Sequence, residues 1–241
     1  MESHSRVRLR TPLSVLLPLL LASLTPALRA QSVPNELTPD EGRDGWQLLF
    51  DGKTTAGWRG FRQHDVPKGW VVTDGALTRA GGGGDLITTR PYRDFELSLE
   101  WKISAGGNSG IMYRVTEDAE ATYETGPEMQ VLDDARHADG KSRLTSAGAS
   151  YGLYPSPAGV VLPAGEWNQV RILVKGNHVE HWLNGVKVVT YELLSPDWAA
   201  KVAASKFAQW PGYGRAPQGY IALQDHGDWV AYRSIKIREL P

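Results

Sequence analysis

A ten-residue run, FELSLEWKIS (residues 95–104), carries a hydrophobic side chain at every second position. Successive side chains of a β-strand point to opposite faces, whereas a helix brings side chains together every three or four residues. Phe95, Leu97, Leu99, Trp101 and Ile103 therefore share one face, and polar residues take the other. The run predicts a strand that is buried on one side only. A chain built from such segments folds by pairing strands.

A second segment, residues 167–192, reads as three strands joined by two tight turns. The turns are the dipeptides GN and NG, which supply the positive φ angles of two-residue hairpin loops. The register that follows places Trp182 between Arg171 and Lys187 on one face. The opposite face is hydrophobic and is formed by Val170, Ile172, Val174, Val179 and Leu183. We expect an antiparallel three-stranded unit here.

The remaining alternating runs predict further strands, and one segment, 196–205, predicts a short helix. These strands are expected at 46–50, 70–79, 85–90, 111–115, 127–132, 219–225 and 229–238. Many strands with short turns are typical of two antiparallel sheets packed face to face. We therefore predict an all-β jelly-roll sandwich, a fold whose curved sheet often forms a groove for sugars.

The N-terminal segment has the layout of a secretory signal. Arginines at positions 6, 8 and 10 precede an apolar stretch, and small residues follow near position 30. The stretch is about 16 residues long, shorter than the roughly 20 of a membrane span. We expect residues 1–30 to be a signal peptide, with an uncleaved anchor as the alternative, 31–43 a linker, and 44–241 one domain. The mature protein is expected to be periplasmic or secreted, with no stable membrane association.

The charge and the cysteine content of the chain argue against certain partners and certain kinds of catalysis. The chain has 26 basic and 27 acidic residues; residues 1–30 hold four Arg and one Glu, so 22 basic and 26 acidic residues remain, a net charge of about −4. Nucleic-acid partners favour clustered Lys and Arg, so none is expected. The chain has no cysteine, which excludes thiol catalysis and disulfides.

The stretch PEMQVLDD (residues 127–134) raises a catalytic possibility. On a strand, Glu128 and Gln130 share one face, while Met129 and Val131 share the other. The pattern resembles the acidic strand of retaining jelly-roll glucanases, but Gln130 stands where those enzymes carry an acid. Retention needs two carboxyl groups about 5 Å apart, so ordinary glycoside hydrolysis is disfavoured. The alternative is a Glu128 carboxylate paired with Arg or Lys on the sheet.

Other polar stretches offer candidate groups. In LQDHGDWV, Gln224 and His226 share a face, and His226 is a candidate general base or metal ligand; the alternative is a plain turn. DDARHADGK (133–141) gathers oxygen ligands, although a solvated loop is the simpler interpretation. His181 is expected to be a packed core histidine, and AGGGGDL a turn.

A glycine- and proline-stiffened loop, SKFAQWPGYGRAP (205–217), carries Trp210 and Tyr213, with Lys206 near its start. Aromatic rings on a stiff loop stack on sugar faces at low entropic cost. Arg114, in GGNSGIMYR, faces away from Tyr113 and its apolar neighbours.

Several motifs together resemble the bacterial 3-keto-disaccharide hydrolase family, long known as a domain of unknown function. They include GWQLLFDGKTTAGW, YETGPEMQVLDD, AGEWNQVRILVKGNHVEHWLNGVKVV and AASKFAQWPGYGRAPQGYIALQDHGD, and they run in order from about residue 44 to the C-terminus. The resemblance implies a concanavalin A-like jelly roll. It also implies an extracytoplasmic enzyme that cleaves glycosides oxidised at carbon 3.

That substrate class would explain the missing carboxylate, because a ketone at carbon 3 acidifies the proton on carbon 2. One base, a group that stabilises the enediolate oxygen, and an acid for the leaving oxygen would then suffice. The candidate base is His226 or Glu128, with Gln130 or a divalent metal holding the oxygen. Arg114 and Lys206 are candidates to polarise the ketone, and Trp210 and Tyr213 to stack on the sugar. The rival function is a non-catalytic carbohydrate-binding module.

Overall fold

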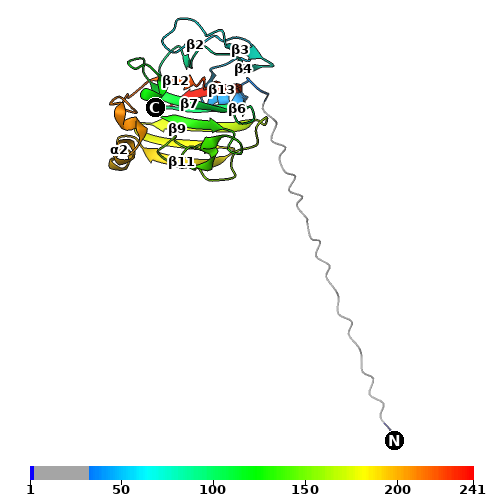
Figure 1. Ribbon diagram of the computed structural model, residues 1–241. Helices are drawn as coiled ribbons and strands as arrows, with labels where there is room; N and C mark the ends of the chain where they lie inside the picture. The colour runs from blue at the N-terminus through cyan, green and yellow to red at the C-terminus, as the bar shows by residue number, and fades with distance from the viewer. Residues whose placement is uncertain (3–32) are drawn as a thin grey trace. The chain divides into compact units, whose positions relative to one another are not determined.

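The computed structural model describes residues 1–2 and 33–241, and residues 32–241 form one compact unit. Two antiparallel sheets pack face to face (Figure 1). The larger sheet has the order β11 (Val186–Glu192), β10 (His178–Leu183), β9 (Asn168–Lys175), β6 (Phe95–Ile103), β13 (Val230–Glu239), β4 (Ala76–Arg79) and β3 (Trp70–Thr73); β1 (Trp46–Leu48) also pairs with β13. The predicted all-β sandwich is confirmed.

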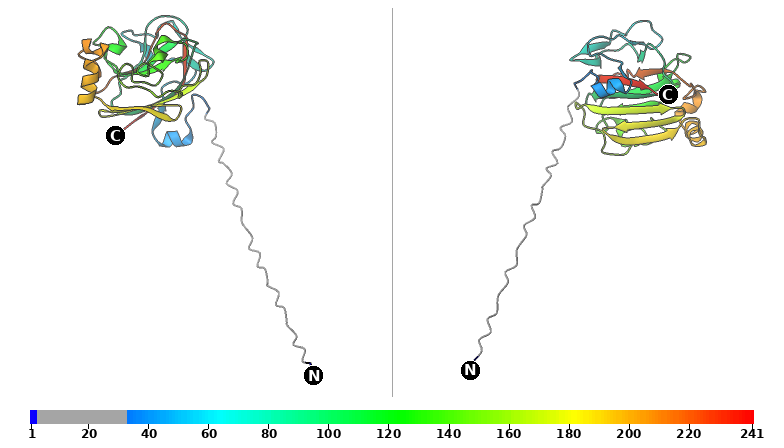
Figure 2. Two further views of the ribbon diagram at one scale, coloured as in Figure 1. Left: turned by 60° about the horizontal axis from the view of Figure 1, so that its bottom comes forward. Right: turned by 180° about the vertical axis from the view of Figure 1, so that it is seen from behind.

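The smaller sheet has the order β2 (Trp58–Gly60), β5 (Leu86–Thr88), β12 (Tyr220–Leu223), β7 (Asn108–Val115) and β8 (Glu128–Leu132). The helices are α1 (Pro39–Arg43) and α2 (Pro196–Ala203), with 3-10 turns η1 (Thr122–Glu124), η2 (Ala138–Lys141) and η3 (Lys206–Gln209). In all views α2 lies beside the strand ends (Figures 1 and 2). In the described part of the chain, no helix is long and apolar enough to cross a bilayer.

The core lies between the two sheets and has the composition that the alternation predicts. The five apolar residues of β6 are at most 1 % exposed, and they meet Met129 and Val131 from β8. Each such side chain contributes about 1.5–3 kcal/mol by leaving water. On the outer face of the larger sheet, Glu96 is buried between ion pairs with Arg171 and Arg238.

The three-stranded unit has the predicted register. Trp182 lies opposite Arg171 and Lys187, and both cations stand over its ring. His181 is fully buried, as expected of a core histidine: its Nε2 lies 2.9 Å from the hydroxyl of Tyr113, and burial lowers its pKa to about 4.

The structure differs from the sequence-based expectations in four places. Residues 70–79, expected as one strand, form the hairpin of β3 and β4. Strand β2 was not expected. Residues 33–43, expected as part of a linker, include α1 and bond to the larger sheet: Asn35 Nδ2 donates to the carbonyl of Gly75, and Asn35 Oδ1 accepts from Ser234 N, both at 2.8 Å. Finally, β7 and β12 change register between Tyr220 and Ala222, where Arg114 has a φ of 57°.

Candidate active site

The outer face of the smaller sheet forms the floor of a polar cavity. Strand alternation places Asn108 and Gly110 of β7, Glu128 and Gln130 of β8, and Gln224 just beyond β12 on this face. Gly110 lies opposite Gln130 in the ladder. A Cβ atom at Gly110 would come within 2.1 Å of Glu128 Oε1. The missing side chain at this position therefore makes room for the carboxyl group.

The cavity has a volume of about 260 Å³. Its lining consists of Asn108, Tyr123, Glu128, Gln130, Tyr151, Lys206, Gln224 and His226. These residues come from two strands, the end of a third and three connecting segments, so the sheet sets the floor and the loops set the walls. Of the predicted site residues, the structure brings together Glu128, Gln130, Lys206 and His226.

Three amide oxygens in this lining are buried without a hydrogen-bond partner: Asn108 Oδ1, Gln130 Oε1 and Gln224 Oε1. An unpaired buried polar atom is costly, so such atoms commonly mark a place where a ligand or water completes the bonding. Gln130 is oriented by its Nε2, which donates to the carbonyl of Thr145 at 3.2 Å. The cavity thus offers three acceptors to hydroxyl groups.

Glu128 is the one carboxylate in the lining and is 6 % exposed. Loss of hydration raises its pKa to about 8, and the nearby Lys206 ammonium opposes this shift only in part. Glu128 therefore carries its proton at neutral pH. A neutral carboxylic acid donates a hydrogen bond, which a carboxylate cannot do.

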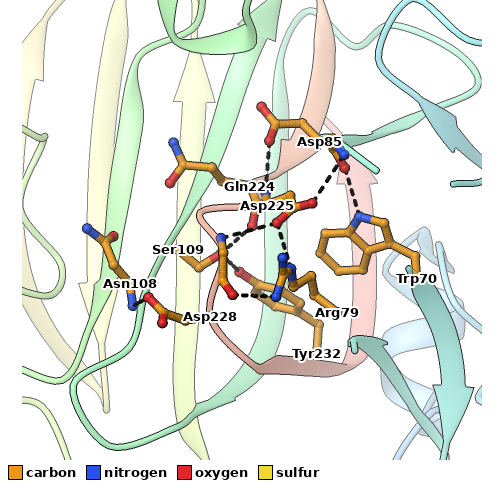
Figure 3. A network of polar contacts seen from close by, with 11 residues as sticks. Trp70, Arg79, Asp85, Asn108, Ser109, Gln224, Asp225, Asp228 and Tyr232 are labelled. Carbon is orange, nitrogen blue, oxygen red and sulfur yellow. Dashed lines mark hydrogen bonds and ion pairs between the residues drawn. The ribbon is translucent and has the colours of Figure 1, made fainter. Parts of the chain in front are cut away.

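The loop after β12 that carries His226 is held by a hydrogen-bonded network (Figure 3). The Asp225 carboxylate accepts from Arg79 Nε at 2.6 Å and from Gly84 N at 3.1 Å. Asp225 N donates in turn to Asp85 Oδ1 at 2.8 Å. The expected turn at AGGGGDL thus supplies part of this anchor. His226 itself is exposed at the mouth of the cavity.

The same network fixes the strand ends on either side of the loop (Figure 3). Ser109 Oγ donates to the carbonyl of Gln224 at 2.7 Å, and Gln224 N donates to the carbonyl of Gly110 at 3.0 Å. Asp228 Oδ2 accepts from Asn108 N at 3.0 Å. These bonds tie the floor residues to the loop that bears the imidazole.

The walls are formed by Tyr123, Tyr151 and Lys206. Tyr123 lies on η1, where Thr122 donates its hydroxyl hydrogen to Asp85. The Tyr151 hydroxyl donates to Asp139 Oδ2 at 3.3 Å; burial and this carboxylate raise the tyrosine pKa to about 12. Lys206 Nζ lies 4.4 Å from the centre of the Tyr151 ring.

Three predicted substrate-binding residues do not line this cavity. Arg114 is 3 % exposed and donates to the carbonyl of Gly176, because the irregularity in β7 redirects it. Tyr213 is 2 % exposed and stacks on Phe207, with ring centres 4.1 Å apart. Trp210 is half-buried behind the wall, with its ring centre 5.4 Å from that of Tyr123. Arg114 and Tyr213 are therefore not part of the candidate site, and Trp210 supports it from behind.

The acidic loop 133–141 is held by hydrogen bonds from neighbouring segments of the chain. Asp133 accepts from Gly106 N at 2.7 Å, and Asp134 from Ala147 N at 2.8 Å. Within the described residues, no three His, Asp or Glu side chains cluster as metal ligands. At the cavity, the residues that would hold a divalent cation are Glu128, His226 and the three amides, Asn108, Gln130 and Gln224. Carboxyl and amide oxygens are the ligands that hard divalent cations prefer.

Sequence reasoning missed Asn108, Tyr123, Tyr151 and the anchoring Asp85. Asn108 could have been found from the sequence pattern. It lies two residues before Gly110 on the strand that pairs with PEMQVL, so Asn108 and Gly110 share the face that carries Glu128. Tyr123 and Tyr151 lie on irregular segments, where side-chain direction does not follow from periodicity.

Comparison with known proteins gives consistent results. Residues 45–238 match the family model described as a 3-keto-alpha-glucoside-1,2-lyase-like domain. A 3-keto-disaccharide hydrolase of Bacteroides thetaiotaomicron is 35 % identical over 250 residues, covering 90 % of this chain and 86 % of that one. Two crystal structures of candidate glycosyl hydrolases from Parabacteroides distasonis are similar. One has a TM-score of 0.80 at 37 % identity, covering 87 % of this chain and 100 % of that one. The other has a TM-score of 0.64 at 31 % identity, covering 81 % and 99 %.

Proposed function

The chain belongs to the 3-keto-alpha-glucoside-1,2-lyase-like family, and from this premise we propose that it cleaves 3-keto-glycosides, including 3-keto-disaccharides. The observation that carries the proposal is one buried, protonated carboxyl group set among three unpaired amide acceptors. Such a cavity suits a ligand with several hydroxyl groups and one carbonyl oxygen. The name of the Bacteroides relative supports the same substrate class.

The lining argues against ordinary glycoside hydrolysis. That reaction uses two carboxyl groups, one of which is ionised. Here the second position is Gln130, and Glu128 carries its proton at neutral pH. A 3-keto sugar removes the need for a pair, because its C2 proton is acidic enough for a single base.

In the proposed reaction, the imidazole of His226 removes the proton from C2. The electron pair moves into the C2–C3 bond and leaves an enediolate with its charge on the C3 oxygen. Glu128 donates a hydrogen bond to that oxygen, as a neutral acid in a dry site can. Gln130 is unsuited to this task, since its amide nitrogen is hydrogen-bonded to Thr145 and its oxygen can only accept a hydrogen bond.

The enediolate then re-forms the ketone, the C1–C2 double bond forms, and the C1–oxygen bond breaks. The leaving oxygen takes up a proton. Water adds to C1 and loses one proton, which balances the proton taken up by the leaving oxygen. The protonated His226 returns its proton to C2, so the net reaction consumes one water. Asn108, Gln130 and Gln224 would accept hydrogen bonds from the sugar hydroxyls and hold C2 toward the imidazole.

We also propose that the protein is exported and acts in the periplasm or outside the cell. The support is the signal-like sequence of residues 1–30, which lies outside the described residues apart from its first two positions. Immunoblotting of periplasmic and cytoplasmic fractions tests this, and recovery only in the cytoplasm would contradict it.

The catalytic proposal is tested by incubating the protein with a 3-keto-disaccharide and with its unoxidised parent, with and without a chelator. We expect cleavage of the keto sugar alone. His226→Ala and Glu128→Gln should each lower kcat/KM by about 10²–10⁴-fold, as expected for loss of proton transfer or of a charge-stabilising donor. Because Glu128 must keep its proton, kcat/KM should fall as the pH rises through about 8.

His64→Ala and Glu166→Gln are matched controls, because both residues are exposed and lie outside the cavity lining. Normal turnover by both site variants would exclude the assigned roles. Sugar binding without any cleavage would indicate a binding module instead. Loss of activity with the chelator would show that a metal takes part.

A further inference from the structure

A second cavity, of about 400 Å³, shares a wall with the candidate active site. Tyr151 and Lys206 line both cavities. The rest of the second lining is Leu144, Gly152, Leu153, Lys201, Ala204, Ser205 and Phe207. Lys206 begins η3, directly after the segment that follows α2, so these two elements place its side chain on the border.

The first cavity is too small for a whole disaccharide. Pockets that hold drug-sized ligands have volumes of about 300–1,000 Å³, whereas this one has about 260 Å³. It accommodates one sugar ring. The group attached at C1 must then extend past the wall, and the second cavity adjoins the first through two shared side chains.

The second lining differs in chemistry from the first. It has aliphatic side chains and two aromatic rings beside the ammonium groups of Lys201 and Lys206 and the hydroxyl of Ser205, and it contains none of the amide or carboxyl acceptors that line the sugar cavity. A second sugar would leave most of its hydroxyl groups without partners there. A flat and largely apolar ring fits better. The Lys206 ammonium, 4.4 Å from the Tyr151 ring centre, is the donor on the border.

We propose that the second cavity holds the leaving group, preferentially as a flat aromatic ring, and that Lys206 donates the proton taken up by the leaving oxygen. This inference rests on the proposed function. When the C1–oxygen bond breaks, the bond electrons stay on that oxygen and a Lys206 proton neutralises it. The resulting amine then removes a proton from the water that adds to C1, which restores the ammonium.

The leaving-group cavity is tested by filling it. Ala204→Trp places an indole in the second cavity, and Ala203→Trp is the matched control, because Ala203 borders a different cavity. Phenyl and methyl 3-keto-glucosides serve as substrates. We expect Ala204→Trp to lower kcat/KM at least tenfold more for the phenyl than for the methyl glycoside, with no such difference for Ala203→Trp. An equal effect on both substrates would overturn the subsite.

The role of Lys206 is tested with leaving groups of different basicity. An alkoxide needs a proton in order to leave, whereas 4-nitrophenolate does not. Lys206→Gln should therefore lower kcat about 100-fold more for the methyl than for the 4-nitrophenyl 3-keto-glucoside, in line with the 10²–10⁴-fold contribution of a general acid. Lys175→Gln, at an exposed strand end, is the control. An equal loss for both substrates would overturn the role as an acid.

The two proposals fail differently. If the wild-type protein cleaves none of these 3-keto-glucosides, the proposed function is wrong. If it cleaves them but the variants show no dependence on the leaving group, the function stands and the leaving-group cavity does not.

Discussion

Glu128 shows how one side chain takes its chemistry from its surroundings. Gly110 leaves room for the carboxyl group, burial removes its hydration, and the nearby Lys206 ammonium compensates for that loss only in part. The neutral form is therefore favoured. A surface glutamate with the same covalent structure would be ionised at pH 7.

This state has a measurable effect on stability. The pKa of Glu128 is about 8 in the folded protein, against 4.5 for an unperturbed glutamate, so the stabilisation from neutral Glu128 is complete below pH 4.5 and is lost as the pH rises to 8. Glu128→Gln stays neutral throughout. The free energy of unfolding of this variant, relative to the wild type, should rise between pH 5 and pH 8 by up to about 1.4 kcal/mol per pH unit. Urea unfolding at several pH values measures this, and parallel pH profiles would contradict it.

At the level of elements, Asp85 connects two segments that carry site residues. One oxygen accepts from Asp225 N in the His226 loop, and the other accepts from Thr122 on the turn that carries Tyr123. Burial raises the pKa of Asp85, with the desolvation offset in part by these same bonds. Asp85 is not itself one of the residues that line the cavity, and it acts by positioning the two segments.

Asp85→Ala should therefore reduce both stability and turnover. Leaving the Asp225 amide without its acceptor costs about 1–3 kcal/mol, and a looser His226 loop should lower kcat. Asp85→Asn retains an acceptor oxygen and should recover part of both. Asp65→Ala, at an exposed position, is the control. Urea unfolding and kcat are the measurements; wild-type values of both for Asp85→Ala would show that the network is dispensable.

The contrast between strands and loops explains how much the sequence predicts. Alternation is a local property, so β6, the 168–192 unit and the shared face of Glu128 and Gln130 follow from it directly. Arg114 was misplaced because a single residue with positive φ breaks the alternation. Tyr151 and Asp85 were missed because their places in the site depend on residues distant in the chain, Lys206 for Tyr151 and Asp225 for Asp85.

At the scale of the whole molecule, the outer faces of the two sheets carry different kinds of side chain. The larger sheet carries ion pairs and cation-capped tryptophans on its outer face, while the smaller sheet carries the candidate site. The segment before residue 44 is attached to the larger sheet by side-chain interactions. Asn35 forms hydrogen bonds with Gly75 and Ser234, and Glu41 forms an ion pair with Lys236.

Removing residues 33–43 should therefore destabilise the domain, although this segment reads as a linker. Three hydrogen bonds of Asn35 are lost, about 1.5–4.5 kcal/mol at roughly 0.5–1.5 kcal/mol per bond, and with them the partly buried ion pair of Glu41 and Lys236. Chains that start at Ser32 and at Asp44 can be compared by urea unfolding, with Asn35→Ala as an intermediate case. Identical midpoints would show that the segment adds nothing.

The hydrogen bond from Gln130 to Thr145 limits which side chains position 130 can accept. A glutamate at position 130 would restore the acidic pattern of a two-carboxylate glycosidase, but one of its oxygens would then meet the Thr145 carbonyl oxygen, and two acceptors repel each other. A single substitution is thus a poor route from this lineage to enzymes that act on unoxidised glycans. The backbone around residue 145 would have to be rebuilt first.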